Sequence, residues 1–179
     1  MRRLWLASSI VNDTLHTLQV FFDSPPSAHS PERFHAEYSK AEQIAIDRFF
    51  EELLSDFRKR LKNAIAELPE GPARFTLAHV NVTCSLALAM TPSMRTMFKM
   101  IYLEPDYYTI WSEFIDEVYS TDTIPESTQF TTRYALEGLL LQSIIGDPLM
   151  PERVNMIKNF VSTLLSDCNG CDYTIKLKM

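Results

Sequence analysis

The segment 131–165, TTRYALEGLLLQSIIGDPLMPERVNMIKNFVSTLL, constrains the fold of this chain more than any other part of its sequence. Its first half predicts a helix that is apolar around most of its circumference, because it carries Leu139, Leu140, Leu141, Ile144 and Ile145. A helix of this kind must be deeply buried or covered by another chain. Gly146 permits the left-handed cap that ends a helix, and Pro151 suits the first turn of the next one.

The second half of this segment predicts another helix, because apolar residues recur at helical spacing at Val154, Ile157, Val161, Leu164 and Leu165. We therefore predict a helical hairpin that begins near Ser127 and packs against its two-fold copy as a four-helix interface. The residues that we assign to this dimer interface are Gly138, Leu141, Ile145, Ile157, Val161 and Leu164.

The rest of the chain also predicts helices. It contains only four glycines in 179 residues, and its ten prolines fall mostly between periodic segments, which favours helices over a turn-rich β fold. We expect helices over residues 3–22, 39–68, 74–90, 92–103 and 105–120. A buried strand is the alternative for 74–90, but its length and its Leu, Ala and Met content favour a helix. The apolar stripe of the long helix comprises Ile44, Phe49, Phe50, Leu53, Leu54, Phe57, Leu61 and Ile65.

Composition limits the classes of protein that this chain fits. Its formal net charge of −6 excludes a basic nucleic-acid footprint across the whole chain. The basic run at 58–62 is interpreted as the solvated face of the long helix, because Phe57 and Leu61 continue the apolar stripe. No apolar run is long enough to span a membrane. The N-terminal segment LWLASSIV is apolar but short and lacks a convincing cleavage site, so we do not interpret it as a signal peptide. Three cysteines, an odd number, fit a reducing cytoplasm better than a disulfide framework.

The order of helices resembles the ligand-binding and dimerisation domain of TetR-type transcriptional regulators. YALEGLLLQSIIGDP and PERVNMIKNFVSTLL look like the last two helices of that family, and FKMIYLEPDYYTIWSEFIDEV looks like the preceding pair in its larger subgroups. The resemblance covers roughly residues 39–166, and FHAEYSKAEQI looks like the family's junction between its DNA-binding unit and its long helix. It implies an all-α regulatory-domain bundle that dimerises through its last two long helices.

The resemblance divides the chain into three parts. Residues 39–167 correspond to the ligand-binding and dimerisation domain, residues 168–179 to a tail, and residues 1–38 to a degenerate helix-turn-helix remnant. This N-terminal segment is short for three helices, Pro25-Pro26 disfavour a helix where one must enter a groove, and the segment has no excess of positive charge. Because Lys and Arg contacts with phosphates supply most non-specific affinity, we expect the chain to bind duplex DNA weakly or not at all.

The resemblance also implies a cavity for a small apolar or amphipathic ligand among the central helices. Methionine adapts to irregular spaces, and methionines and aromatic residues crowd the segment 90–111. His79 allows three interpretations: a satisfied core histidine, part of a surface face, or a polar contact inside a ligand cavity. We assign the lining of the cavity to Phe75, His79, Thr83, Met94, Met97, Tyr102, Trp111 and Tyr134.

Nothing in the sequence indicates catalysis, a metal site or a cofactor. The pair Cys168 and Cys171 has no second pair or nearby histidine, so we interpret both residues as reduced thiols in a tail. Glu137 lies in the apolar hairpin, and Arg133, four residues earlier, is its expected partner. We expect a cytoplasmic, homodimeric, ligand-responsive transcriptional regulator of the TetR type or a divergent relative. The alternatives are an interaction protein that lacks DNA binding and acts by heterodimerisation or sequestration, and a truncated regulator whose true start lies upstream.

Overall fold

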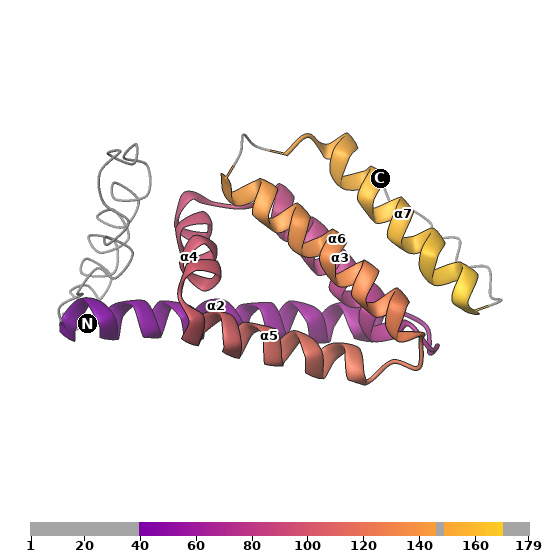
Figure 1. Cartoon of the computed structure of the whole chain (residues 1–179), viewed down its shortest axis with the longest axis horizontal. Coiled ribbons are helices and arrows are strands. Elements are labelled where there is room, and N and C mark those ends of the chain that lie inside the picture. The colour runs from indigo at the N-terminus through magenta and orange to yellow at the C-terminus, as the bar shows by residue number, and fades with distance from the viewer. Residues whose placement is uncertain (1–39, 146–148, 170–179) are drawn as a thin grey trace.

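The computed structural model describes residues 40–145 and 149–169, and these residues form an all-α fold without a strand (Figure 1). The helices of this part are α2 (Lys40–Glu67), α3 (Arg74–Leu88), α4 (Pro92–Leu103), α5 (Pro105–Ser120), α6 (Glu126–Ile145) and α7 (Pro151–Asn169). The helix expected over residues 3–22, the first residue of the helix expected over 39–68 and the expected helix end Gly146 lie outside the described residues. The all-α prediction is confirmed for the described part of the chain.

The expected bounds of the helices over 92–103 and 105–120 are confirmed by α4 and α5. The Thr91 side chain accepts a hydrogen bond from the Met94 backbone nitrogen at 3.3 Å, so it caps α4, and Pro92 is the first residue of that helix. Pro105 likewise opens α5. The segment that could have formed a buried strand is helical from Arg74 to Leu88. Proline fits these positions because the first backbone N–H groups of a helix have no intrahelical acceptor.

One side of α2 packs into the molecule, and the other side is charged. Its buried residues are Ala45, Ile46, Phe50, Leu53, Leu54, Phe57 and Leu61. The prediction for Ile44 is wrong, because its side chain is 58 % exposed. Residues 46, 50, 53, 57 and 61 follow the helical period, and Ile44 lies two positions before that stripe, on the opposite side of the helix. Arg58, Lys59 and Arg60 are exposed, as expected for a solvated face.

Helix α3 is the centre of the fold. Ten of its 15 residues are buried, and it contacts α2, α5, α6 and α7. Figure 1 shows α6 alongside α3, with α7 on the outer side of this pair and α2 and α5 along the opposite edge of the molecule. A helix covered on several sides cannot show a strong amphipathic pattern, which explains why its sequence allowed a strand as an alternative.

Two apolar clusters lie on different sides of α3. We call the cluster shared with α2, α4 and α5 the aromatic core, and its largest fully buried side chains include Phe57, Met97, Phe98, Met100, Ile101, Trp111 and Ile115. We call the cluster shared with α6 and α7 the hairpin core, and it includes Leu77, Val80, Cys84, Leu136, Leu139, Val154, Val161 and Leu165. Both cores depend on residues from α3, so this helix joins the two halves of the bundle.

The α5–α6 loop holds the start of α3 in place. Asp122 is 8 % exposed, and its carboxylate accepts hydrogen bonds from the backbone nitrogens of Phe75 and Thr76 at 3.1 and 2.6 Å. A carboxylate at a helix N-terminus satisfies otherwise unpaired N–H groups and interacts favourably with the helix dipole. The backbone of Thr123 also donates to the Pro72 carbonyl at 3.0 Å. These contacts place the first turns of α3 and α6 at the same end of the molecule.

In the described part of the chain, no helix is both long enough and apolar enough to cross a membrane.

Candidate functional site

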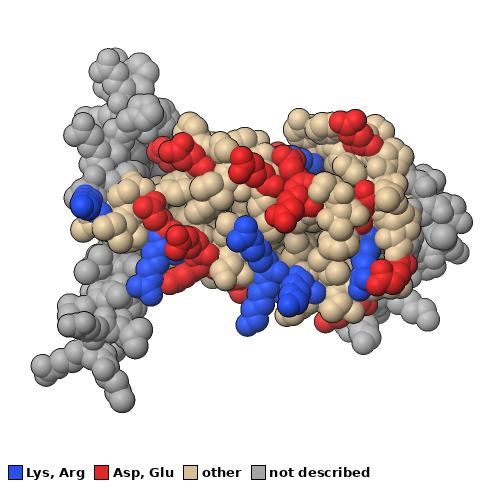
Figure 2. All heavy atoms as spheres, turned by 90° about the horizontal axis from the view of Figure 1, so that it is seen from below, with Lys and Arg blue, Asp and Glu red and all other residues tan. Residues whose placement is uncertain are grey.

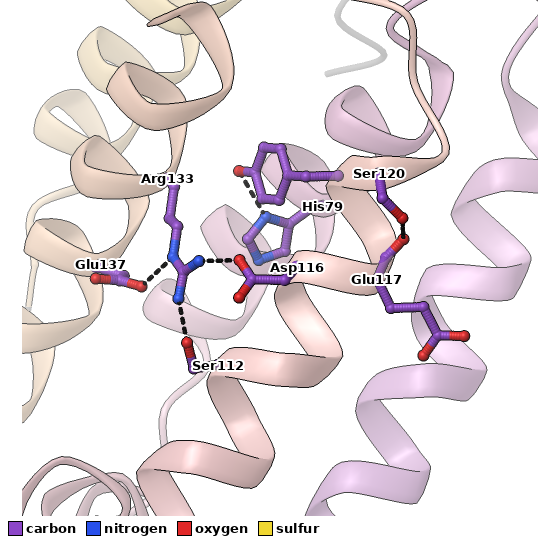
Figure 3. Close-up of polar contacts among 8 residues, drawn as sticks. His79, Ser112, Asp116, Glu117, Ser120, Arg133 and Glu137 are labelled. Atoms are coloured by element: carbon purple, nitrogen blue, oxygen red, sulfur yellow. Dashed lines mark hydrogen bonds and ion pairs between the residues drawn. The ribbon is translucent and has the colours of Figure 1, made fainter. Parts of the chain in front are cut away.

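The side chain of Arg133 on α6 contacts polar side chains of both α5 and α6 (Figure 3). Its Nε donates to the Glu137 carboxylate at 2.8 Å, and one terminal nitrogen donates to the Ser112 hydroxyl at 2.7 Å. The other terminal nitrogen donates to the Asp116 carboxylate. The predicted pairing of Arg133 with Glu137 is therefore confirmed. Asp116 and Ser112 lie on α5, so the network also links the two helices.

This network is partly shielded from water. The side chains of Arg133 and Glu137 are 14 % and 16 % exposed, whereas that of Asp116 is 61 % exposed. Burial by itself lowers the pKa of Arg133, but the hydrogen bond and charge of Glu137, together with the charge of Asp116, outweigh it and raise the pKa above its ordinary value. The guanidinium is therefore fixed in its charged form, and it provides a permanent positive charge beneath the surface.

His79 lies on the inner side of this network and is neutral. It is 3 % exposed, and its Nδ1 lies 3.1 Å from the Tyr119 hydroxyl. Burial, with a smaller contribution from the charge of Arg133, lowers the pKa of His79 to about 3. The structure thus supports the interpretation of His79 as a satisfied core histidine, whose partner the sequence did not indicate.

A cleft of about 190 Å³ opens beside the Arg133 network, between α5 and the first half of α6. It is lined by Asp116, Tyr119, Ser120, Glu126, Gln129, Phe130 and Arg133. Among its lining residues, Tyr119 is 4 % exposed, and its hydroxyl lies within hydrogen-bond distance of His79. The cleft therefore connects a solvent-exposed carboxylate surface with the buried contact between α3 and α5.

The residues predicted to line a ligand cavity lie elsewhere. Trp111 and Met97 are fully buried in the aromatic core, and Trp111 makes edge contacts with Phe57 and Phe98 at ring-centroid distances of 5.0 and 5.5 Å. None of the eight predicted residues lines the described cleft. Phe75, Met94 and Tyr102 are half-buried against the aromatic core, and Thr83 is buried without a hydrogen-bond partner for its hydroxyl among the described residues.

Tyr134 does not join the other predicted cavity residues, because it is 65 % exposed on the outer side of α6. Its neighbour Arg133 points inward to α5, and successive residues on a helix are separated by about 100°. The cleft could be anticipated only in part. The Arg133–Glu137 spacing was visible in the sequence, but Asp116 is brought to Arg133 by the packing of α5 against α6.

The hairpin exposes apolar side chains along both of its helices. On α6 these are Phe130, Tyr134 and Ile145, and on α7 they are Met156 and Phe160, with exposed fractions from 48 % to 78 %. Leu141 and Leu164, two of the predicted interface residues, are half-buried at matching helical positions, and Gly138 is exposed with no atom within 4 Å of an added Cβ. Exposed apolar residues at these spacings form a stripe along each helix, and we call them the hairpin stripes.

One predicted interface residue belongs to the interior of this chain instead, and a second packs partly against that interior. Val161 is fully buried in the hairpin core, and Ile157 is half-buried against it. The assignment of Val161 to an exposed interface is corrected, because a side chain without exposed surface cannot contact a second chain. Phe130, Tyr134, Met156 and Phe160 take its place on the exposed surface, and their spacing of four residues on each helix was present in the sequence.

The described residues contain no candidate metal site, and the Cys84 thiol is not reactive. No group of three or more His, Cys, Asp or Glu side chains among residues 40–145 and 149–169 is placed to hold a metal ion. Burial raises the pKa of the Cys84 thiol to about 11, so this thiol stays protonated and is a poor nucleophile. Helix α7 continues through Asn169, so Cys168 belongs to this helix rather than to a tail, and Cys171 lies outside the described residues.

Comparisons with protein-family models, with curated proteins and with solved structures found no match for this chain.

Proposed function

We propose that this protein is a homodimeric, ligand-responsive transcriptional regulator of the TetR type or a divergent relative of that type. The observation that carries this proposal is the pair of hairpin stripes, which leave large apolar side chains of the last two helices in water. Contiguous exposed apolar surface on a soluble chain marks an interaction site. The last two helices are also the elements that the resemblance assigns to dimerisation.

The order and lengths of the helices support the same proposal. A long helix, α2, precedes a buried central helix, two shorter helices joined at a proline, and a terminal hairpin. The central position of α3, which shares both apolar cores, would let a change in the α5–α6 region reach the hairpin. A ligand response requires such a physical connection between a binding site and an interface.

The surface charge of the described residues supports a limited role in DNA contact. Figure 2 shows Lys and Arg interspersed with Asp and Glu on the face formed by α2 and α5, with one small basic group near the centre of this face. We propose that the isolated chain binds duplex DNA weakly at physiological salt, since phosphate contacts by basic residues provide most non-specific affinity.

Light scattering tests the dimer. We expect the wild type to have twice the chain mass and the variant Tyr134→Glu, Phe160→Glu to have the chain mass, with the helical circular dichroism unchanged. Ser55→Glu, an exposed substitution on α2, is the matched control and should remain dimeric. A double variant that stays dimeric would show that the hairpin stripes are not the interface.

A DNA titration distinguishes the alternatives. Purified protein is titrated with genomic fragments at low and physiological salt, and weak, non-selective binding is expected. Tight, selective binding at the higher salt would favour an ordinary repressor. A wild-type chain that is monomeric and pairs with a TetR-type regulator supplied in the same sample would favour the alternative function, heterodimerisation or sequestration.

A further inference from the structure

The α5–α6 cleft presents uncharged hydrogen-bond acceptors as well as carboxylates. The Gln129 side-chain nitrogen donates to the Ile124 carbonyl at 3.3 Å, and its side-chain oxygen can accept a hydrogen bond from a ligand. The Ser120 hydroxyl donates to the Glu117 carbonyl at 2.8 Å, which leaves its lone pairs. Each side-chain nitrogen of Arg133 donates one hydrogen bond to a partner on α5 or α6, which leaves two of its five N–H groups. The acceptors of Gln129 and Ser120 match a ligand that donates hydrogen bonds.

The charge of the cleft points to a cation. Asp116 and Glu126 line it together with Arg133, and Glu137 neutralises Arg133 from the other side. These four groups carry three negative charges and one positive charge, so the excess is negative. The Glu126 carboxylate makes no hydrogen bond or ion pair with residues 40–145 and 149–169, and Glu126 lies in the first turn of α6. A neutral hydrogen-bond donor would leave this excess negative charge uncompensated.

An aromatic surface completes the cleft. Phe130 lines it and stacks on Tyr134 at a centroid distance of 6.2 Å with an interplanar angle of 16°. Phe130 is 48 % exposed, so its ring is available to a ligand. A cation over an aromatic ring within about 6 Å of its centre is attracted by the negative face of the ring. The same ring offers contact to an apolar group.

We propose that the α5–α6 cleft binds a small organic cation, a primary ammonium with a short apolar or aromatic body. The ammonium lies between Asp116 and Glu126 and donates to Gln129, and the apolar body packs on Phe130. The cleft has a volume of about 190 Å³, whereas pockets for drug-sized ligands have volumes of roughly 300–1,000 Å³. The ligand is therefore smaller than a typical drug molecule. This site deepens the ligand response of the proposed function and rests on it for its biological role.

Binding in the cleft affects the contact between α5 and α6. The ligand ammonium and Arg133 compete for the Asp116 carboxylate, which joins the two helices. Phe130 belongs both to the cleft and to the hairpin stripes. The cleft therefore adjoins the surface proposed for dimerisation. A ligand bound in the cleft contacts that surface through the side chain of Phe130.

The probe that tests the cleft is phenethylammonium, with neutral 2-phenylethanol and anionic 3-phenylpropionate as comparison compounds. Each is titrated into the full ¹⁵N-labelled chain at neutral pH, and backbone amide shifts are followed. We expect saturable shifts at residues 116–133 with phenethylammonium, at least about fivefold weaker binding of the alcohol, and no saturable binding of the anion, since one unit charge near a surface carboxylate contributes about this factor. Affinity for the cation should fall as salt rises.

Two variants locate the charge. Glu126→Gln should weaken phenethylammonium binding by about threefold to fivefold, whereas Glu113→Gln, which removes an exposed carboxylate of α5 outside the cleft, should leave it unchanged. Equal binding of the alcohol, equal effects of the two variants, or absence of saturable shifts would overturn the proposal. The result is separable from the proposed function: cation binding to a monomeric wild type would contradict only the dimeric regulator, and a dimer without cation binding would contradict only this site.

Discussion

The aromatic core and the hairpin stripes use the same kinds of side chain with opposite results. Trp111 is 1 % exposed and contacts Phe57 edge-on at a centroid distance of 5.0 Å. Phe130 and Tyr134 also form a ring pair, at 6.2 Å, but they are 48 % and 65 % exposed. Side chains from α2, α3, α4 and α5 pack around Trp111 in the aromatic core. No element in the described part of the chain covers Phe130 and Tyr134 in the hairpin stripes.

This difference teaches that apolar periodicity alone does not assign a residue to the core of its own chain. Both groups repeat at helical spacing, and only the packing of neighbouring helices separates them. Substitutions in the aromatic core should therefore reduce the stability of the single chain, whereas substitutions in the hairpin stripes should change association. The predictions below test this separation, from the largest expected effect on the free energy of unfolding to the smallest.

Trp111→Ala should lower the free energy of unfolding by about 3–5 kcal/mol, because it removes a fully buried aromatic side chain and leaves a cavity. Urea denaturation followed by circular dichroism measures this loss. Ile110→Ala, which truncates the 44 % exposed neighbour in the same helix, is the control and should cost less than about 1 kcal/mol. Similar losses for both variants would mean that Trp111 is not packed as described.

Arg133→Met should lower the free energy of unfolding by about 2 kcal/mol, because it leaves the shielded Glu137 carboxylate without its partner. The matched control is Arg60→Met, which breaks the exposed pair with Asp56 and should change stability by at most about 0.5 kcal/mol. Both changes remove one arginine from an i, i+4 pair. An equal effect at the two sites would show that shielding of the Arg133 network has no energetic consequence.

Acid should destabilise the wild type more than the variant His79→Gln. The folded pKa of His79 is about 3 and the ordinary value is 6.5, so the unfolded chain takes up a proton first as the pH falls. The contribution of His79 to stability is present above pH 6.5 and is lost between pH 6.5 and 3. The loss amounts to at most about 1.4 kcal/mol per pH unit. Urea denaturation at pH 6.5, 5.5 and 4.5 measures it, and parallel curves for the two proteins would contradict the buried neutral imidazole.

Tyr134→Ser should have the smallest effect on the unfolding of the single chain. In the background Phe160→Glu, which is expected to weaken association, the change should stay within about 0.5 kcal/mol, as is usual for exposed positions. In the wild-type background the same substitution should weaken the dimer, measured by sedimentation over a range of concentrations. A large loss in the Phe160→Glu background would place Tyr134 in the core of its own chain.

Much of the helical layout could be predicted from local signals. Thr91 with Pro92, and Pro105, mark helix starts because capping and the missing proline N–H are properties of a few adjacent residues. The Arg133–Glu137 pair was also predictable, because residues four apart on a helix are neighbours. By contrast, Asp122 as the cap of α3 lies 46 residues from Thr76, and nothing in the local sequence indicates that contact.

The sequence by itself determined that this chain is helical, where most of its described helices begin and end, and that the last two helices carry more apolar surface than a small core accepts. The tertiary structure decided the side of each helix that is buried. It placed Val161 in the hairpin core, Tyr134 in solvent, and Asp116 beside Arg133. The physical reason is the range of the interactions: helix signals act over about four residues, whereas burial depends on which distant helix fills the facing volume.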